Sequence, residues 1–386
     1  MRTIRFCHEL PGENPGFLVS TARPAGLSAA AIRKTAAKVE TAMMSRRHIL
    51  KFSAAIGALL AFHGSVAGEL LFVRPLRKER PRVPIDPFTE GGKALVGVGG
   101  EGSVEARVRE AVALIGGFRK LDIRGKTVLV KPNVVSGSPS PTTTSPELVA
   151  AVVRLLYREG AREVVVGDMS ALITRTTLKN MRKCGIRQAA ESAGARVVAF
   201  EDAGWVEVPL PGARYLKQAY VTEWLYRTDL FINLPVVKTH HSASYSICLK
   251  NFIGCTHLKQ RPYLVDRGHW EELVAEFNLA CRPDLNIVDA TVAMIEGGPW
   301  EGTPAPTGIV IASGDRVAAD AVGLGMIRSF GRWQMVTGKG VWEQRQIRHA
   351  LLLGLGKGEG EIVLRTGSGD ERFRELMSAV RRETGL

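Results

Sequence analysis

Residues 230–241 read LFINLPVVKTHH, and the rest of the chain is interpreted outward from this stretch. An almost unbroken apolar run of strand length predicts a strand buried on both faces, as in a parallel sheet. Pro235 marks its exit, and Lys238, His240 and His241 follow. Because ligands of open α/β sheets bind at the carboxyl ends of the strands, we expect these polar groups to contribute to a binding site.

A second stretch has the same form. Residues 127–133 read TVLVKPN, an apolar strand closed by Lys131, Pro132 and Asn133. If both strands belong to one parallel sheet, Lys131 and Lys238 lie at the same edge of it. A hydroxyl-rich loop over 136–145 follows and ends at a predicted helix, with Ser145 as its N-cap and Pro146 at its first position. Such a loop favours either an anion site or a flexible loop.

A third motif follows the opening stretch. Residues 249–254 read LKNFIG, within a helix that we expect over 244–252 and that Gly254 ends. Lys250 and Asn251 reach the same site if they lie on the inner face of this helix. The alternative is a lysine on a solvated helix face.

Strands and helices alternate along the remainder of the chain, with no internal repeat. This alternation predicts an α/β fold with a mainly parallel sheet flanked by helices and a ligand site at the carboxyl ends of the strands. The expected strands cover 94–98, 127–130, 163–167, 196–200, 230–234, 285–288, 308–312 and 361–366, and the expected helices 105–115, 148–157, 188–193, 244–252, 271–280 and 317–327, with one more helix in the tail.

The formal charge of +14 is unevenly distributed. Residues 1–67 carry +6 and residues 68–82 another +3, which leaves +5 for the rest of the chain. The charges of that part are interspersed, without a basic helix or interleaved aromatic and basic residues. We therefore expect no nucleic acid among the partners.

The amino-terminal part has the features of an export signal. Residues 45–51 read SRRHILK, a close match to the twin-arginine motif, and an apolar stretch over 52–62 and small residues at 65–67 follow in order. The sequence predicts export to the periplasm by the twin-arginine translocation machinery. Since residues 52–73 are apolar enough to span a bilayer, an uncleaved membrane anchor is the alternative.

These features divide the chain into four parts. We assign 1–43 to an extension from a misplaced translation start, 44–67 to the signal segment, 68–92 to a basic Pro-rich linker and 93–386 to the α/β domain.

Charged side chains close four of the predicted strands. They are Lys131, Asp168, Lys238 and Asp289. Lysines bind carboxylates or phosphates, whereas carboxylates and histidine bind a metal or move protons. The combination therefore suits a small anionic ligand, alone or bridged by a divalent metal. We assign catalysis to Lys238, His240 and Asp289, substrate binding to Lys131, Asn133, Lys250 and Asn251, and metal binding to Asp168, His240 and Asp289.

Each charged residue also has a structural alternative. Asp315 and Asp168 are natural cap and turn residues, and Lys131 can extend to solvent from a strand end. Cysteine usage is low beyond residue 67, with Cys184, Cys248, Cys255 and Cys281 dispersed. Without short spacing between them, we expect buried apolar thiols and no iron–sulfur cluster.

Taken together, four motifs resemble domain-of-unknown-function family 362. They read VLVKPN at 128–133, INLPVVKTH at 232–240, LKNFIG at 249–254 and SGDRVAAD at 313–320, and the resemblance extends from about residue 93 to about residue 330. It implies a bacterial or archaeal protein, in some members exported by the twin-arginine route. Many relatives carry a ferredoxin-like module, but this chain lacks its cysteine run. The family has no assigned activity.

Two functions from different classes fit these observations. The first is an exported enzyme that binds a small anionic substrate at the sheet edge. The second is a non-catalytic protein that stores or delivers a metal or cofactor to a redox partner.

Overall fold

The computed structural model describes residues 73–386, and all of them belong to the compact unit that continues to the carboxyl terminus. The predicted extension at 1–43 and the signal segment at 44–67 lie outside the described residues. No helix within 73–386 combines the length and apolar character that a bilayer crossing requires.

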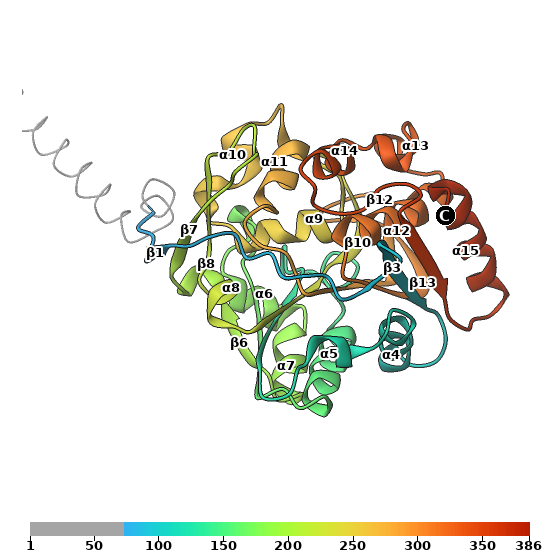
Figure 1. The fold of residues 1–386 in the computed structure, drawn as a ribbon, viewed down its shortest axis with the longest axis horizontal. Helices are drawn as coiled ribbons and strands as arrows, with labels where there is room; N and C mark the ends of the chain where they lie inside the picture. The colour runs from blue at the N-terminus through green and yellow to red at the C-terminus, as the bar shows by residue number, and fades with distance from the viewer. Residues whose placement is uncertain (1–72) are drawn as a thin grey trace, which may run out of the picture. The chain divides into compact units, whose positions relative to one another are not determined.

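One sheet of eleven strands organises the described residues (Figure 1). Its main path follows the order β14-β3-β13-β12-β9-β4-β5-β6, while β10 and β11 extend from β12 and β2 pairs with β3. The strands are β2 (Thr89–Glu90), β3 (Lys93–Gly99), β4 (Thr127–Pro132), β5 (Glu163–Asp168), β6 (Arg196–Ala199), β9 (Leu230–Leu234), β10 (Val236–His240), β11 (Ser244–Ser246), β12 (Leu285–Gly297), β13 (Gly302–Ser313) and β14 (Ile362–Thr366).

Most neighbouring strands run parallel. The pairs β12·β9, β9·β4, β4·β5 and β5·β6 are parallel, as is β14·β3, whereas β13 runs antiparallel to both of its neighbours. The predicted α/β fold with a mainly parallel sheet is therefore confirmed. Parallel strands need long crossovers, which explains the helices between them.

Helices cover both faces of the sheet. On β4, Val128 and Val130 pack into one apolar core and Leu129 into the other, because successive side chains of a strand point to opposite faces. The first core includes α4 (Val104–Leu114), α5 (Pro146–Arg158), α6 (Thr177–Lys183) and α7 (Ile186–Ser192). The second includes α9 (Cys248–Asn251), α11 (Trp270–Phe277), α12 (Arg316–Ser329), α14 (Arg345–Leu352) and α15 (Glu371–Thr384), as Figure 1 shows.

Two of the predicted helix caps are present. The Ser145 hydroxyl accepts the N–H of Leu148, with Pro146 at the first position of α5. Asp315 caps α12 by accepting the N–H groups of Val317 and Ala318. The structural alternative for Asp315 is thus the observed one.

The helix predicted over 244–252 is wrong. Residues Ser244–Ser246 form β11, the helix α9 begins only at Cys248, and a 3-10 turn follows over Phe252–Cys255. The buried carboxylate of Asp320 accepts the N–H groups of Cys248 and Leu249, which fixes the helix start from another part of the chain.

The strands predicted at 285–288 and 308–312 are too short. They are the ends of β12 and β13, which form a long antiparallel hairpin. The sequence predicts that Asp289 ends the first strand, but Asp289 lies inside β12. Its oxygens accept the N–H of Ser145 and the N–H and hydroxyl of Thr291, so the strand continues past it.

A second, smaller sheet was not predicted. It joins β1 (Arg77–Lys78), β7 (Trp205–Pro209) and β8 (Gln218–Thr222). Residues 77–92 belong to the segment assigned to a linker, yet they pack on the body through β1, β2 and the buried Phe88. The remaining short helices are α8 (Trp224–Arg227), α10 (Pro262–Val265) and α13 (Gln334–Thr337).

A row of polar side chains crosses the middle of the sheet. The pairing places Lys131 of β4 opposite Asn233 of β9, Asn233 opposite Asn286 of β12, and Asn286 opposite Ser313 of β13. Asn233 Nδ2 donates to Asn286 Oδ1 at 3.0 Å, and Asn286 Nδ2 donates to the carbonyl of Ser313 at 3.2 Å. From α9, Asn251 accepts a hydrogen bond from Lys131 Nζ at 3.2 Å and donates to Asn233 Oδ1 at 2.8 Å. Each buried amide is thereby satisfied by its neighbour.

Removing one member of this row should destabilise the fold. In Asn286→Ala, the buried Nδ2 group of Asn233 keeps only a 3.4 Å contact with the carbonyl of Cys248. A buried group left unsatisfied costs about 1–3 kcal/mol, so the free energy of unfolding of the full chain should fall by that amount in urea titrations. Gln188→Ala removes an exposed amide on α7 and serves as the control, with a change of about 0.5 kcal/mol or less. Equal effects of both substitutions would contradict a role for the polar row.

Candidate functional site

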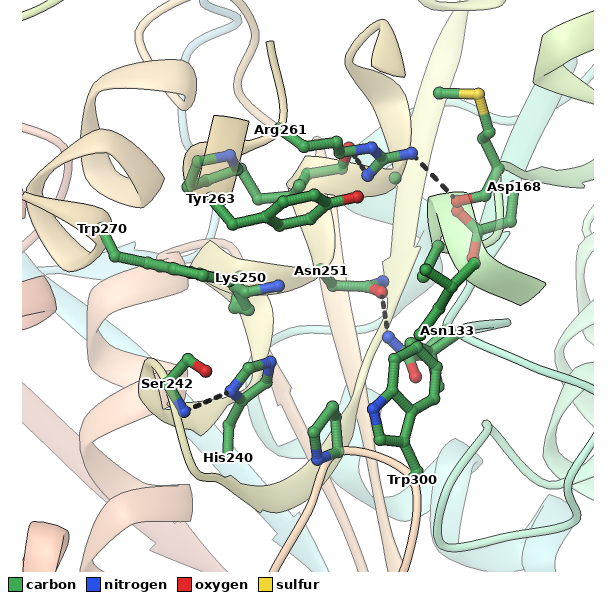
Figure 2. Close-up of a pocket in the computed structure, with 18 of the residues that line it drawn as sticks. Asn133, Asp168, His240, Ser242, Lys250, Asn251, Arg261, Tyr263, Trp270 and Trp300 are labelled. Atoms are coloured by element: carbon green, nitrogen blue, oxygen red, sulfur yellow. Dashed lines mark hydrogen bonds between the residues drawn. The ribbon is translucent and has the colours of Figure 1, made fainter. Parts of the chain in front are cut away.

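A cavity of about 550 Å³ opens at the carboxyl ends of β4, β5 and β10. Its lining comes from these strand ends, from α9 and the turn after it, from α10 and the start of α11, and from the loop at 299–300 (Figure 2). The predicted residues Lys131, Asn133, Asp168, Lys250 and Asn251 all line it, together with His240. The sheet edge chosen from the sequence is therefore the edge that carries the cavity.

Lys131 and Asp168 form a buried ion pair at the cavity wall. Lys131 Nζ lies 2.7 Å from Asp168 Oδ1, and both side chains are almost fully buried. Lys131 Nζ also donates to the Pro132 carbonyl at 3.0 Å and to Asn251 Oδ1 at 3.2 Å. Asp168 Oδ2 accepts the N–H of Val134 at 2.7 Å. Both charges are thus compensated within the protein, as buried ions require.

Gly254 has no room for a side chain because of this pair. A Cβ atom at that position would lie 2.1 Å from Asp168 Oδ1 and 2.6 Å from Lys131 Nζ. The last residue of the LKNFIG motif was predicted as a helix stop. Its position shows a different reason for glycine, which is the close approach of the backbone to the ion pair.

Lys238 is absent from the cavity lining. Its Nζ donates to Asn133 Oδ1 at 2.8 Å and to the Thr142 carbonyl at 2.6 Å, and the residue is 1% exposed. Burial, followed by the charge of Lys250, holds the pKa of Lys238 well below its ordinary value. Lys238 therefore holds the cavity residue Asn133 by a hydrogen bond without lining the cavity itself. The catalytic role assigned to Lys238 stays a prediction.

The three predicted metal ligands do not converge. Asp168 pairs with Lys131, and Asp289 accepts hydrogen bonds from Ser145 and Thr291 without lining the cavity. Within residues 73–386, no three His, Cys, Asp or Glu side chains form a group suited to a metal ion. Asp168 and His240 both line the cavity whereas Asp289 does not, and the metal assignment stays a prediction. The four cysteines of this part of the chain are free and buried.

His240 presents a defined tautomer to the cavity. Its Nδ1 accepts the N–H groups of Ser242 at 3.1 Å and Ala243 at 3.2 Å. The proton of the neutral ring is therefore on Nε2, the nitrogen that points away from this turn in Figure 2. Burial, then the charges of Lys250 and Lys238, hold the pKa of His240 well below its ordinary value. The ring is a neutral hydrogen-bond donor at neutral pH.

Lys250 projects into the cavity between Trp270 and Asn251 (Figure 2). Within the described residues, its Nζ has no hydrogen-bond acceptor and no carboxylate within ion-pair distance. Enclosure by the protein, followed by the charges of Arg261 and Lys131, lowers the pKa of Lys250 to about 7. The amine is therefore divided between its neutral and charged forms at neutral pH.

Sequence reasoning missed a basic and aromatic group that closes the cavity. It comprises Arg261, Tyr263, Arg267, Trp270 and Trp300. The first four lie between two expected helices, in a stretch without a periodic pattern, where a cluster of basic and aromatic residues was the available signal. Loops of this kind carry binding residues more often than their sequence pattern indicates.

Hydrogen-bond donors exceed acceptors around the cavity. Arg261 Nε and Trp270 Nε1 are buried and have no acceptor among the described residues. The amine of Lys250, a half-buried residue, has no acceptor there either. Asp168 is the carboxylate of the lining, and Lys131 already neutralises it. Lys250, Arg261 and Arg267 are left with unbalanced positive charge.

The family model described as a domain of unknown function (DUF362) matches residues 128–325, which include every residue that lines the cavity. The chain belongs to this family. It is also 30% identical over 234 residues to a thylakoid-associated protein of Synechocystis sp., with 57% of this chain and 69% of that protein covered.

Among solved structures, the chain is similar to the lactate racemase apoprotein from Thermoanaerobacterium thermosaccharolyticum. The TM-score is 0.35 at 13% sequence identity, over 77% of this chain and 88% of the other. The overlap is loose, and no conclusion about the activity of this DUF362 protein follows from it.

The ion pair can be tested through Gly254. In Gly254→Ala the added methyl group displaces Asp168 or Lys131, and breaking a buried pair costs about 3–5 kcal/mol. We expect a loss of that size in the free energy of unfolding, measured by urea titration of the full chain. Gly358→Ala is the matched control, since the nearest atom to its Cβ lies at 3.7 Å, an ordinary contact. A similarly small effect at both positions would show that the pair tolerates displacement.

Proposed function

We propose that this DUF362 protein is an enzyme that binds a small organic anion in the cavity at the sheet edge. The observation that carries the proposal is the unbalanced charge of Lys250, Arg261 and Arg267 beside donors without acceptors. A carboxylate or phosphate supplies both the missing charge and the missing acceptors.

The cavity suits a ligand with an apolar or planar body. Tyr263, Trp270 and Trp300 line it, and aromatic walls bury such surfaces favourably. A volume of about 550 Å³ matches a metabolite-sized ligand. Arg267 is exposed at the mouth and has no carboxylate partner among residues 73–386, so it is placed to receive the anion.

His240 and Lys250 are the groups that we assign to chemistry. The Nε2–H of His240 donates to a developing negative charge, and Lys250 takes up or releases a proton near pH 7. This assignment replaces Lys238 and Asp289, whose polar atoms are occupied by protein groups. The alternative of metal or cofactor delivery has less support, since its expected donor set is dispersed.

The proposed location is the periplasm, reached by the twin-arginine route, with membrane anchoring by an uncleaved signal as the alternative. The SRRHILK motif at 45–51 supports export. A relative named for its association with thylakoids gives weaker support for a membrane-associated compartment.

Anion binding should depend on Arg267 and on pH. Thermal-shift titrations with inorganic phosphate and small carboxylates should stabilise the protein, and Arg267→Gln should weaken the best ligand roughly ten- to a hundred-fold, the loss of one charge-assisted hydrogen bond. Affinity should also fall as the pH rises through about 7, because Lys250 then loses its positive charge. Arg348→Gln, at an exposed position on α14, is the control. Equal affinity of the Arg267 and Arg348 variants would place the anion elsewhere.

Export should depend on the arginine pair. We expect the double substitution Arg46→Lys with Arg47→Lys to retain the protein in the cytoplasm, as measured by fractionation and immunoblotting. A chain that starts at Met44 should be exported as well as the full chain. Undiminished export of the double variant would refute the twin-arginine assignment.

A further inference from the structure

We propose that Lys250 is a nucleophile that forms an imine with the carbonyl carbon of an oxo acid bound in this cavity. The inference rests on the proposed function, because the carboxylate of the oxo acid is the anion that the cavity binds. It goes further by naming the reacting group of the protein, the reactive group of the ligand and the covalent bond between them.

Three lysines lie close to one another here, and their contacts separate them. Lys131 Nζ contacts Asp168 Oδ1, the Pro132 carbonyl and Asn251 Oδ1. Lys238 Nζ donates to Asn133 Oδ1 and to the Thr142 carbonyl. Both amines are held by protein groups and are not available to attack a ligand.

Lys250 differs from these two lysines in its position and in its contacts. It lines the cavity, and no acceptor among the described residues holds its Nζ. A lysine attacks a carbonyl through the lone pair of its neutral amine, which an unpaired and enclosed position favours. Its position therefore meets the geometric requirement for nucleophilic catalysis that the other two lysines fail.

The charges around Lys250 favour the neutral amine. The titratable and charged groups near it are Lys131 on β4, Asp168 on β5, Lys238 and His240 on β10, and Arg261 before α10. Asp168 is the carboxylate of this set, and its ion pair with Lys131 offsets its charge. Burial, followed by the charges of Arg261 and Lys131, lowers the pKa of Lys250 to about 7, which leaves a large share of its amine unprotonated at neutral pH.

His240 supplies a hydrogen bond to the oxygen that becomes negative during imine formation. Its ring and the amine of Lys250 lie close to each other in the cavity wall (Figure 2), and its proton is on Nε2 because Nδ1 accepts two backbone N–H groups. Arg267 at the mouth is available for the carboxylate of the oxo acid. Hydrogen-bond donor, nucleophile and anion-binding group thus come from three different elements around one cavity.

The step balances without an oxidant or reductant. The Lys250 lone pair forms a bond to the carbonyl carbon, the C=O π electrons move to oxygen, and oxygen gains the proton that nitrogen loses. The carbinolamine then expels its hydroxyl group, which accepts a hydrogen bond from the Nε2–H of His240, takes a proton from solvent and leaves as water, while nitrogen forms the C=N bond. The resulting iminium withdraws electrons from an adjacent C–C or C–H bond and facilitates its cleavage.

Reductive trapping tests the proposal. The full chain is incubated separately with pyruvate, 2-oxoglutarate and phenylpyruvate in the presence of cyanoborohydride, and the adduct is located by mass spectrometry of peptides. We expect one reduced adduct on Lys250 for at least one of the three acids. Under saturating oxo acid, the trapping rate should rise about ten-fold between pH 6 and pH 8, since the neutral fraction of an amine with pKa about 7 rises by that factor.

Two variants make the result specific. Lys250→Arg keeps a positive charge but cannot form an imine, so it should lose the adduct while retaining a melting shift with the same acid. Lys179→Arg changes an exposed lysine on α6 and should trap like the wild type.

Each outcome decides between the two proposals. Stabilisation by an oxo acid without any adduct on Lys250 overturns imine formation and leaves anion binding standing. Adducts spread over exposed lysines, with Lys250 unmodified, also overturn it. If none of the three acids stabilises or labels the protein while phosphate binds through Arg267, the imine is refuted and the anion site is retained.

Discussion

Burying a lysine and an aspartate at a sheet edge costs several kcal/mol for each ion unless their charges and hydrogen-bonding groups are compensated. The Lys131–Asp168 pair meets this condition through Asn251, the Pro132 carbonyl and the N–H of Val134. The condition extends to the backbone, since Gly254 must pass where a single methyl group would collide with the pair. Two strands and the segment after α9 are held together by these contacts, which position the cavity wall.

The hydrogen bonds within the cavity wall determine which polar groups remain free to bind a ligand. Asn251 bridges the ion pair and the amide row of Asn233 and Asn286, and Asn133 joins it to Lys238. Because these side chains satisfy one another, their polar atoms are not free to bind a ligand. Lys250, in the same turn as Asn251, is left out of the network and keeps its amine toward the cavity. A saturated network beside one unpaired amine is the arrangement from which the proposed chemistry follows.

The strands of the parallel core were predictable because their signal is local. Apolar runs at 127–130 and 230–234 become β4 and β9, and the Ser145 cap with Pro146 begins α5 where expected. The helix at 244–252 could not be found in this way, since Asp320 fixes the start of α9 from 72 positions away. The predicted strand ended too early at Asp289 for a similar reason, since the N–H of Ser145, 144 positions away, helps to accommodate this carboxylate inside β12.

The sequence by itself determined which edge of the sheet is polar and which motifs meet there, because parallel strands bring their carboxyl ends together whatever lies between them. Only the tertiary structure decided which polar groups bind each other and which face the cavity. Lys238 donates to Asn133 across 105 positions, and Lys131 donates to Asn251 across 120. Three lysines with similar local surroundings in the sequence therefore differ in role, because hydrogen-bond partners and depth of burial are properties of the folded assembly and not of the neighbouring residues.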